Sequence, residues 1–244
     1  MVDSIGAGRV VRIAEDEVFT RLDNQESASG PVRLAGALLR GPGGVLRDIS
    51  LSHGLLHHAA SLFALTAAFA GAYGAVIGLH QPGLQTLYAA LKVPIVVLGS
   101  ALLCTPTLFV FNAVGGSRLT LSQILCLVLA MSAAISLMLV AFAPIAWFFG
   151  VSTNGIGFLT FLHVGVFVIA AGFGLRMMDL ARRYLRHLDG TEAIGPILLL
   201  FWCGLVVVVG LQMAHYVRPI MTPGPFFTGE RGLFLEVLVP AHLR

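Results

Sequence analysis

The sequence predicts an all-α membrane protein: a polytopic bundle of five transmembrane helices with its N-terminus inside and its C-terminus outside. The chain is 57% hydrophobic and only 11% charged, with a mean hydropathy of +0.89, whereas soluble domains carry about 25% charged residues. Five apolar runs exceed the ~20 residues that cross ~30 Å of hydrocarbon. They lack the alternation of barrel strands. The spans are therefore helices, because lipid offers no partner for an open backbone.

These runs divide the chain into three regions. Residues 1–50 form a cytoplasmic N-terminal region, residues 51–216 the transmembrane domain, and residues 217–244 a periplasmic C-terminal tail. No cleavable signal peptide precedes the first run, which is expected to act as an uncleaved anchor. The predicted spans are 55–79, 88–114, 119–149, 156–178 and 194–216.

Residues 31–40 precede the first span and mix arginine with leucine, valine and alanine. Arg33 and Arg40 are seven residues apart and share one face of a helix, while apolar residues cover much of the rest. This pattern predicts an amphipathic helix lying on the membrane, with an ordinary linker helix as the alternative. The sequence GPGG at 41–44 is expected to end it.

The first two spans carry small and helix-kinking residues. Ser52 is the expected N-cap of the first span, and Gly74 with Gly78 forms a GxxxG pair that permits close helix contact. In the second span, Pro106 and a second proline predict kinks. Lys92, one turn inside that span, is expected to snorkel to the headgroups.

A tight turn, FNAVGGSRL, joins the second span to the third. Gly115 and Gly116 are expected to reverse the chain, with Ser117 capping the next helix. The third span is longer than a bilayer requires, so it must tilt, protrude or bend near Pro144. The fourth is expected to continue past the membrane, where Asp179 and an arginine four residues on can pair.

The distribution of arginine predicts the orientation. The loops at 80–87 and 150–155 hold no arginine or lysine. The segments placed inside hold Arg9, Arg12, Arg21, Arg33, Arg40, Arg47, Arg118, Arg176, Arg182, Arg183 and Arg186. The positive-inside rule therefore favours a bacterial inner-membrane protein with five spans and a cytoplasmic N-terminus. The net charge of +3 reflects this placement and does not indicate nucleic-acid binding.

Ionisable and polar residues within the spans are the candidates for function. His163 could relay protons or bind a metal or haem, or it could simply hydrogen-bond between helices. Neutral polar residues could line a pore, although such residues more often join neighbouring helices. The candidates for pore or polar contacts are Asn112, Gln123, Ser132, Ser136, His163 and Gln212. No sequence motif predicts a catalytic residue, a cofactor or a metal site. The three cysteines, each within an apolar run, are expected to be buried hydrophobes.

Two surfaces are predicted from charge and composition. The first is an outer interaction surface where the last span leaves the membrane; it comprises His215, Arg218, Phe226 and Phe227. The second is an inner cluster that could bind anionic lipid headgroups or could act in orientation alone. It comprises Arg176, Arg182, Arg183 and Arg186.

The residues 103–123, which read LCTPTLFVFNAVGGSRLTLSQ, together with the later Gln212 and Arg218–Pro219, resemble an uncharacterised family of bacterial multi-pass membrane proteins. The shared features are Pro106 in the second span, the turn, the late glutamine and Arg-Pro, and an aromatic pair at 226–227. The resemblance covers roughly residues 90–230 and implies a shared fold but no activity. The topology is also loosely similar to that of Yip-type membrane proteins.

Spans almost free of charge favour a non-enzymatic scaffold or assembly subunit over ion or proton coupling. The expected partners are membrane lipids and either further copies of the chain or another membrane protein, with no nucleic acid. The alternatives are a homo-oligomeric channel or transporter with a neutral polar path, and a membrane subunit of a redox or lipid enzyme using His163. A pore requires the polar residues to converge on one path, whereas a scaffold predicts that they are dispersed and hydrogen-bonded.

Overall fold

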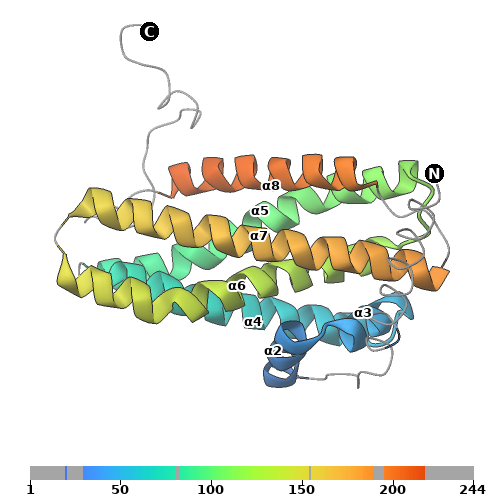
Figure 1. The fold of residues 1–244 in the computed structure, drawn as a ribbon, viewed down its shortest axis with the longest axis horizontal. Helices are drawn as coiled ribbons and strands as arrows, with labels where there is room; N and C mark the ends of the chain where they lie inside the picture. The colour runs from blue at the N-terminus through green and yellow to red at the C-terminus, as the bar shows by residue number, and fades with distance from the viewer. Residues whose placement is uncertain (1–19, 21–29, 81–82, 154, 190–194, 218–244) are drawn as a thin grey trace, which may run out of the picture.

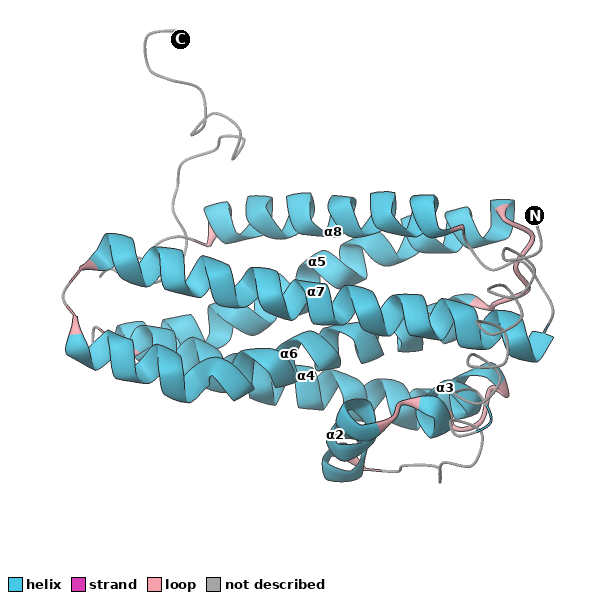
Figure 2. Cartoon of the chain, in the orientation of Figure 1, coloured by secondary structure: helices cyan, strands magenta, loops and turns pink. Residues whose placement is uncertain are grey.

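The structure, a computed structural model, describes residues 20, 30–80, 83–153, 155–189 and 195–217. Every regular element within those residues is a helix, and none of them is in a strand (Figure 2). The elements are α2 (Pro31–Arg40), α3 (Gly43–Ser50), α4 (Leu55–Gly78), α5 (Leu84–Val114), α6 (Leu121–Ser152), α7 (Ile156–Asp189) and α8 (Pro196–Tyr216).

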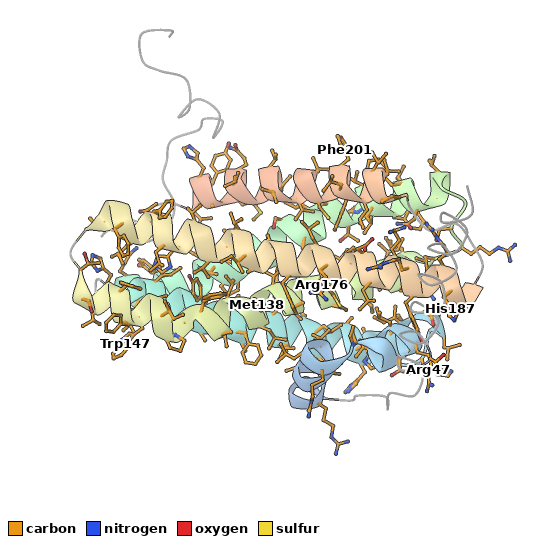
Figure 3. All side chains as sticks on the ribbon, viewed as in Figure 1. Arg47, Met138, Trp147, Arg176, His187 and Phe201 are labelled. Carbon is orange, nitrogen blue, oxygen red and sulfur yellow. The ribbon has the colours of Figure 1, made fainter. Side chains whose placement is uncertain are left out.

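The five long helices run alongside one another, and the short helices α2 and α3 lie across one end of the bundle (Figure 1). All five are long and apolar enough to cross a membrane. The predicted fold class is confirmed: the protein is an all-α, multi-pass membrane bundle. We call the end that carries α3, Arg47 and His187 the arginine end, and the end that carries Trp147 the opposite end (Figure 3).

The predicted spans are all present, and most of their bounds agree with the helices to within two residues. α5 begins at Leu84, four residues before the predicted start, and α6 continues to Ser152. α7 is one helix of 34 residues, so the predicted fourth span and its extension are continuous. Hydropathy identifies the apolar part of a helix. α7 continues beyond that part through charged residues, so its end could not be located from hydropathy.

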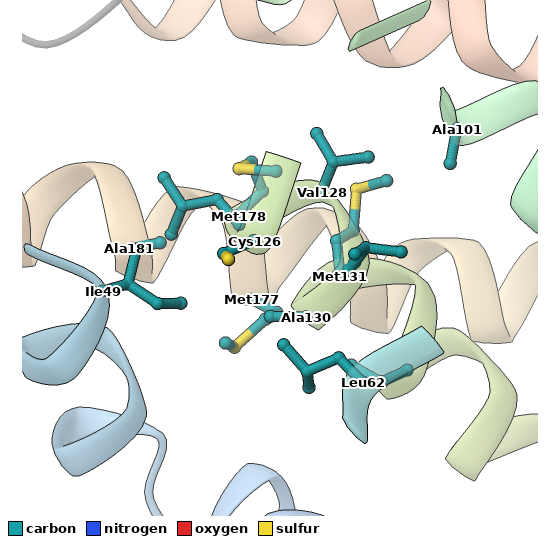
Figure 4. Packing of buried hydrophobic residues seen from close by; sticks show 14 of the residues in the cluster. Ile49, Leu62, Ala101, Cys126, Val128, Ala130, Met131, Met177, Met178 and Ala181 are labelled. Atoms are coloured by element: carbon teal, nitrogen blue, oxygen red, sulfur yellow. The ribbon is translucent and has the colours of Figure 1, made fainter. Parts of the chain in front are cut away.

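α6 is the central helix. In its most apolar stretch 72% of the residues are buried, against 22% in α7 and 17% in α8. Its small residues Ala130, Ala133 and Ala134 are fully buried and let the surrounding helices approach closely. Figure 4 shows the core at the arginine end, where residues of α3, α4, α6 and α7 pack together.

Small residues also join α4 to α5. A Cβ added at Gly74 would collide with the carbonyl oxygen of Ala89, and one added at Gly78 would lie 2.5 Å from Cα of Thr86. The two helix backbones are therefore in contact at these glycines. The prediction that Gly74 and Gly78 form a helix interface is confirmed.

The amphipathic pattern of residues 31–40 does form a helix, α2, and part of its apolar face packs on the bundle. Leu34 and Leu38 are buried, because α2 packs against α4 and α6, while Arg33 and Arg40 are exposed. The glycines and proline end α2 at Arg40, as predicted. A further helix, α3, starts at Gly43 and buries its own apolar residues. The sequence did not predict α3, since it is short and begins with two glycines.

Two predicted helix caps are wrong. Ser52 has φ +58° and precedes α4, whose N-cap is Gly54 in the left-handed conformation. Ser117 does not cap α6; Thr120 does. The Thr120 hydroxyl accepts the Gln123 backbone N–H at 3.3 Å, and the Gln123 side chain accepts the Thr120 N–H at 2.8 Å. This reciprocal capping box sits three residues later because the turn after Val114 is longer than the sequence suggested.

Gly116 lies in that turn with φ +81°, a region that L side chains rarely adopt. We expect Gly116→Val to lower the free energy of unfolding by about 1–3 kcal/mol, the cost of a strained backbone, and to reduce the yield of folded protein. Gly116→Asn is expected to recover part of the loss, since asparagine tolerates this conformation. Unfolding in mixed micelles measures both. A Gly116→Val protein that folds normally but loses its function would instead identify the turn as a site.

Candidate functional site

The polar residues predicted to line a path are hydrogen-bonded within the bundle. Ser132 and Ser136 are fully buried, and each hydroxyl donates to the carbonyl oxygen four residues earlier at 2.9 Å. Asn112 is buried and donates to the carbonyl of Leu108 at 2.9 Å. A small cavity of about 20 Å³ is lined by Asn112 but by neither serine. These residues do not converge on one space.

Gln123 serves a different purpose from the one considered for a pore. Besides capping α6, its side-chain nitrogen donates to the carbonyl oxygens of Ile49 at 3.1 Å and Ser50 at 2.9 Å. These are carbonyls of the last residues of α3, which have no partner within the helix. One buried glutamine therefore starts α6, satisfies the end of α3 and fixes the two helices to each other.

His163 lies about two turns inside α7 and bonds to a neighbouring helix. Its Nδ1 is 2.8 Å from the hydroxyl of Tyr73 on α4, and both side chains are buried. The two rings meet edge to face at 5.7 Å, and Phe167 meets the Tyr73 ring in the same way at 5.9 Å. Among the roles considered for His163, this geometry fits a hydrogen bond between two helices. Among the described residues, no group of three or more His, Cys, Asp and Glu could hold a metal.

Lys92 does not reach outward, and the expectation that it snorkels to the headgroups is wrong. Its side chain has 0% exposure, and Nζ lies 5.9 Å from the centre of the Tyr88 ring. Gln85, seven residues earlier on the same face of α5, is also buried. A charge buried within a span is costly and marks a candidate functional residue. Burial and snorkelling differ in the direction of the Lys92 side chain, which the sequence alone does not give.

A second buried polar contact lies at the arginine end. The carboxylate of Asp48 on α3 lies 3.5 Å from Nε2 of His58 on α4, with 8% of each side chain exposed. Near them, the thiol of Cys126 donates to the carbonyl of Leu55 at 3.4 Å. His58 is buried although it lies in the first turn of α4, at the end of a span.

α8 is held to α5 by Trp202, which is fully buried. Its indole N–H donates to the carbonyl of Cys104 at 2.8 Å. That carbonyl lies two residues before Pro106. Tryptophan, with its apolar ring and single donor, suits this position. Neither Trp202 nor Tyr73 was predicted as a site residue.

The arginine cluster of α7 is partly internally paired. Arg182 contacts Asp179 at 2.6 Å and Arg183 contacts the other carboxylate oxygen at 3.0 Å, which confirms the predicted i,i+4 pair. Arg176 and Arg186 are exposed. Arg176 lies closer to the middle of the bundle than His187, as Figure 3 shows.

The predicted outer surface is described only in part. Gln212 and His215 are half-buried near the end of α8, with the His215 ring 6.2 Å from that of Tyr216. Arg218, Phe226 and Phe227 lie outside the described residues. The three cysteines are buried, as expected, on three different helices.

In comparisons with known proteins, no family model, no curated protein and no solved structure matches this chain. What the residues can do is therefore judged from geometry. Gln123, Tyr73–His163, Asp48–His58 and Trp202 share one property: each joins two helices. The arrangement stabilises a particular bundle.

We expect the Tyr73–His163 bond to contribute about 1 kcal/mol, within the range of up to ~1.7 kcal/mol measured for bonds between membrane helices. Tyr73→Phe and His163→Leu should each lower the free energy of unfolding, and the double variant should lose less than the sum. A double-mutant cycle in micelles measures this coupling. Additive losses would contradict the contact.

Proposed function

We propose that this chain is a non-enzymatic scaffold or assembly subunit of the bacterial inner membrane. The observation that supports the proposal is the uneven packing of the bundle. α4 packs tightly on both α5 and α6, whereas α7 and α8 are mostly unburied and have little contact with each other. Phe161 of α7 is 78% exposed and Ile197 of α8 is 84% exposed. These two helices offer apolar faces to a partner within the membrane.

The polar residues also favour this reading over a neutral polar path. Ser132, Ser136 and Asn112 bond to their own helix, and Gln123 and His163 bond to neighbours.

The proposal is tested by purifying the protein in mild detergent and measuring its mass against the 25.8 kDa of one chain. A photo-crosslinking residue placed at Phe161 or Phe201 should yield one discrete product, either a dimer or a fixed heteromeric complex. The matched control is Phe63, exposed on α4, where no such product is expected. A monomeric mass together with crosslinks to lipid alone at all three positions would contradict the proposal.

One observation favours a second function, movement of an anionic solute. Lys92 is a fully buried charge within α5, near the buried Gln85. In sealed proteoliposomes, anion flux that is present in the natural protein and lost in Lys92→Gln would support this function. Absence of flux in both would leave Lys92 with a structural role.

The orientation follows from the arginine asymmetry. We expect reporter fusions after Leu188 to read cytoplasmic and fusions after Arg244 to read periplasmic, because five spans place the ends on opposite sides. Alkaline phosphatase is active only in the periplasm and a fluorescent protein is fluorescent only in the cytoplasm, so the two fusions report on which side each point lies. Both fusion points reading cytoplasmic would rule out five spans in this orientation.

A further inference from the structure

α7 and α8 diverge over α6 and leave an apolar groove of about 380 Å³, a volume in the range of small-molecule sites, roughly 300–1,000 Å³. It opens on the outer surface of the bundle, since Leu200 is 66% exposed and Val207 48% exposed. The floor and walls include Met131, Ile135, Ala171, Leu175, Cys203 and Gly204. Every residue that lines it is apolar.

A second, smaller cavity lies one helical turn closer to the arginine end. Leu127, Met178 and Leu199 line it, and each is within about one turn of a residue that lines the groove on the same helix. This cavity differs from the groove in being lined also by Arg182 and Asn112. The Arg182 side chain is 9% exposed, so a nearly buried guanidinium borders the small cavity.

We propose that the groove and the small cavity bind one phospholipid with an anionic headgroup. An acyl chain fills the groove and the phosphate lies at Arg182 and Arg186. Asp179 accepts two bonds from Arg182, one from Nε at 3.1 Å and one from a terminal nitrogen at 2.6 Å. These orient a group that carries five N–H donors. Residues 176–187 hold four arginines against one aspartate, a net charge of +3, and basic pockets between spans bind anionic headgroups.

The length of the site fits a lipid. Ala171 and Arg182 are eleven residues apart on α7, about 16 Å at 1.5 Å per residue. One leaflet of hydrocarbon is about 15 Å thick, half of the ~30 Å core. A chain whose phosphate is held at Arg182 therefore ends near Ala171. A partner helix, ~10 Å wide and spanning the whole core, would need a longer groove than one that ends at Ala171 and Val207. This inference does not rest on the proposed scaffold function.

Native mass spectrometry of the purified protein tests the proposal, with phosphatidylglycerol and phosphatidylcholine of identical chains as probes. We expect one phosphatidylglycerol per chain, retained about fivefold or more over phosphatidylcholine, the preference that a single arginine near an anionic surface provides. Equal retention of the two lipids would overturn the proposal.

Two variants test the two halves of the site. An added Cβ at Gly204 meets no atom within 4 Å, so Gly204→Leu fills the groove without a clash and should abolish the adduct. Gly172→Leu is the matched control: its added Cβ also meets nothing, and it does not line the groove. Arg182→Gln should reduce the preference to near unity, while Arg40→Gln, which removes a charge from exposed α2, should not.

Thermal unfolding of each variant separates lost binding from lost folding. If Arg182→Gln does not fold, Arg186→Gln takes its place, with the same expected loss of preference. If Gly204→Leu retains as much phosphatidylglycerol as Gly172→Leu does, the proposal is overturned. A dimer that replaces the lipid adduct would also overturn it, because the groove would then hold a second copy.

Discussion

Gly74→Leu is expected to separate α4 from α5 and to lower the free energy of unfolding by about 3 kcal/mol or more, at the upper end of the 1–3 kcal/mol typical of overpacking. The reason is that a Cβ at this position meets backbone, the carbonyl of Ala89, which cannot turn aside as a side chain could. Unfolding in mixed micelles measures the loss.

The three glycines of this interface should give graded effects with alanine. An added Cβ at Gly71 would lie 3.2 Å from the nearest atom, Ala90 O, whereas the one at Gly78 would lie 2.5 Å from Thr86 Cα. Gly71→Ala should therefore cost less than Gly78→Ala or Gly74→Ala. Gly165→Leu on α7 is the matched control, since its Cβ meets nothing within 4 Å. Equal effects of Gly74→Leu and Gly165→Leu would contradict the close contact.

Trp202→Ala is expected to detach α8 from the bundle. Removing a large buried aromatic side chain typically costs about 3–5 kcal/mol, and the carbonyl of Cys104 also loses its donor. Because α8 has little contact with α7, its place in the bundle depends on its contacts with α5, where Trp202 is its largest buried side chain. Limited proteolysis between α7 and α8, and the thermal midpoint in detergent, should both report the change.

Two further variants divide the effect of Trp202 into its parts. Trp202→Phe keeps most of the ring but loses the hydrogen bond, and should cost about 1 kcal/mol. Trp147→Ala removes a tryptophan that is 52% exposed on α6 and should leave the stability nearly unchanged. A Trp202→Ala protein as stable as Trp147→Ala would show that other contacts hold α8.

The number and order of the spans could be predicted because the lipid solvent imposes them: a long uncharged run admits one structure in hydrocarbon. Helix ends could not, since they depend on local partners. Thr120 rather than Ser117 starts α6, because Gln123 is placed to complete a capping box. α3 was missed because the burial of its apolar residues comes from α6 and α7, which follow much later in the sequence.

The site residues were predicted less well, for a related reason. Composition identifies a polar residue within a span, but its partner is set by helix packing. His163 was chosen from sequence, yet Tyr73, ninety residues away, gives it its role. The sequence gives the position of Lys92 along α5 but not the face of the helix on which it lies. That face is turned toward the interior of the bundle, so the side chain is buried and not exposed to lipid.

The bond from Trp202 to Cys104 also has a consequence for biogenesis. The two residues are 98 positions apart, so a ribosome adding 5–20 residues per second completes α8 roughly 5–20 seconds after the carbonyl of Cys104 has been made. α4 and α5, adjacent in the chain and matched at their glycines, can pair soon after α5 leaves the translocon. The α5 surface that receives Trp202 therefore cannot be covered by α8 until that last long helix has been made, well after α4 and α5.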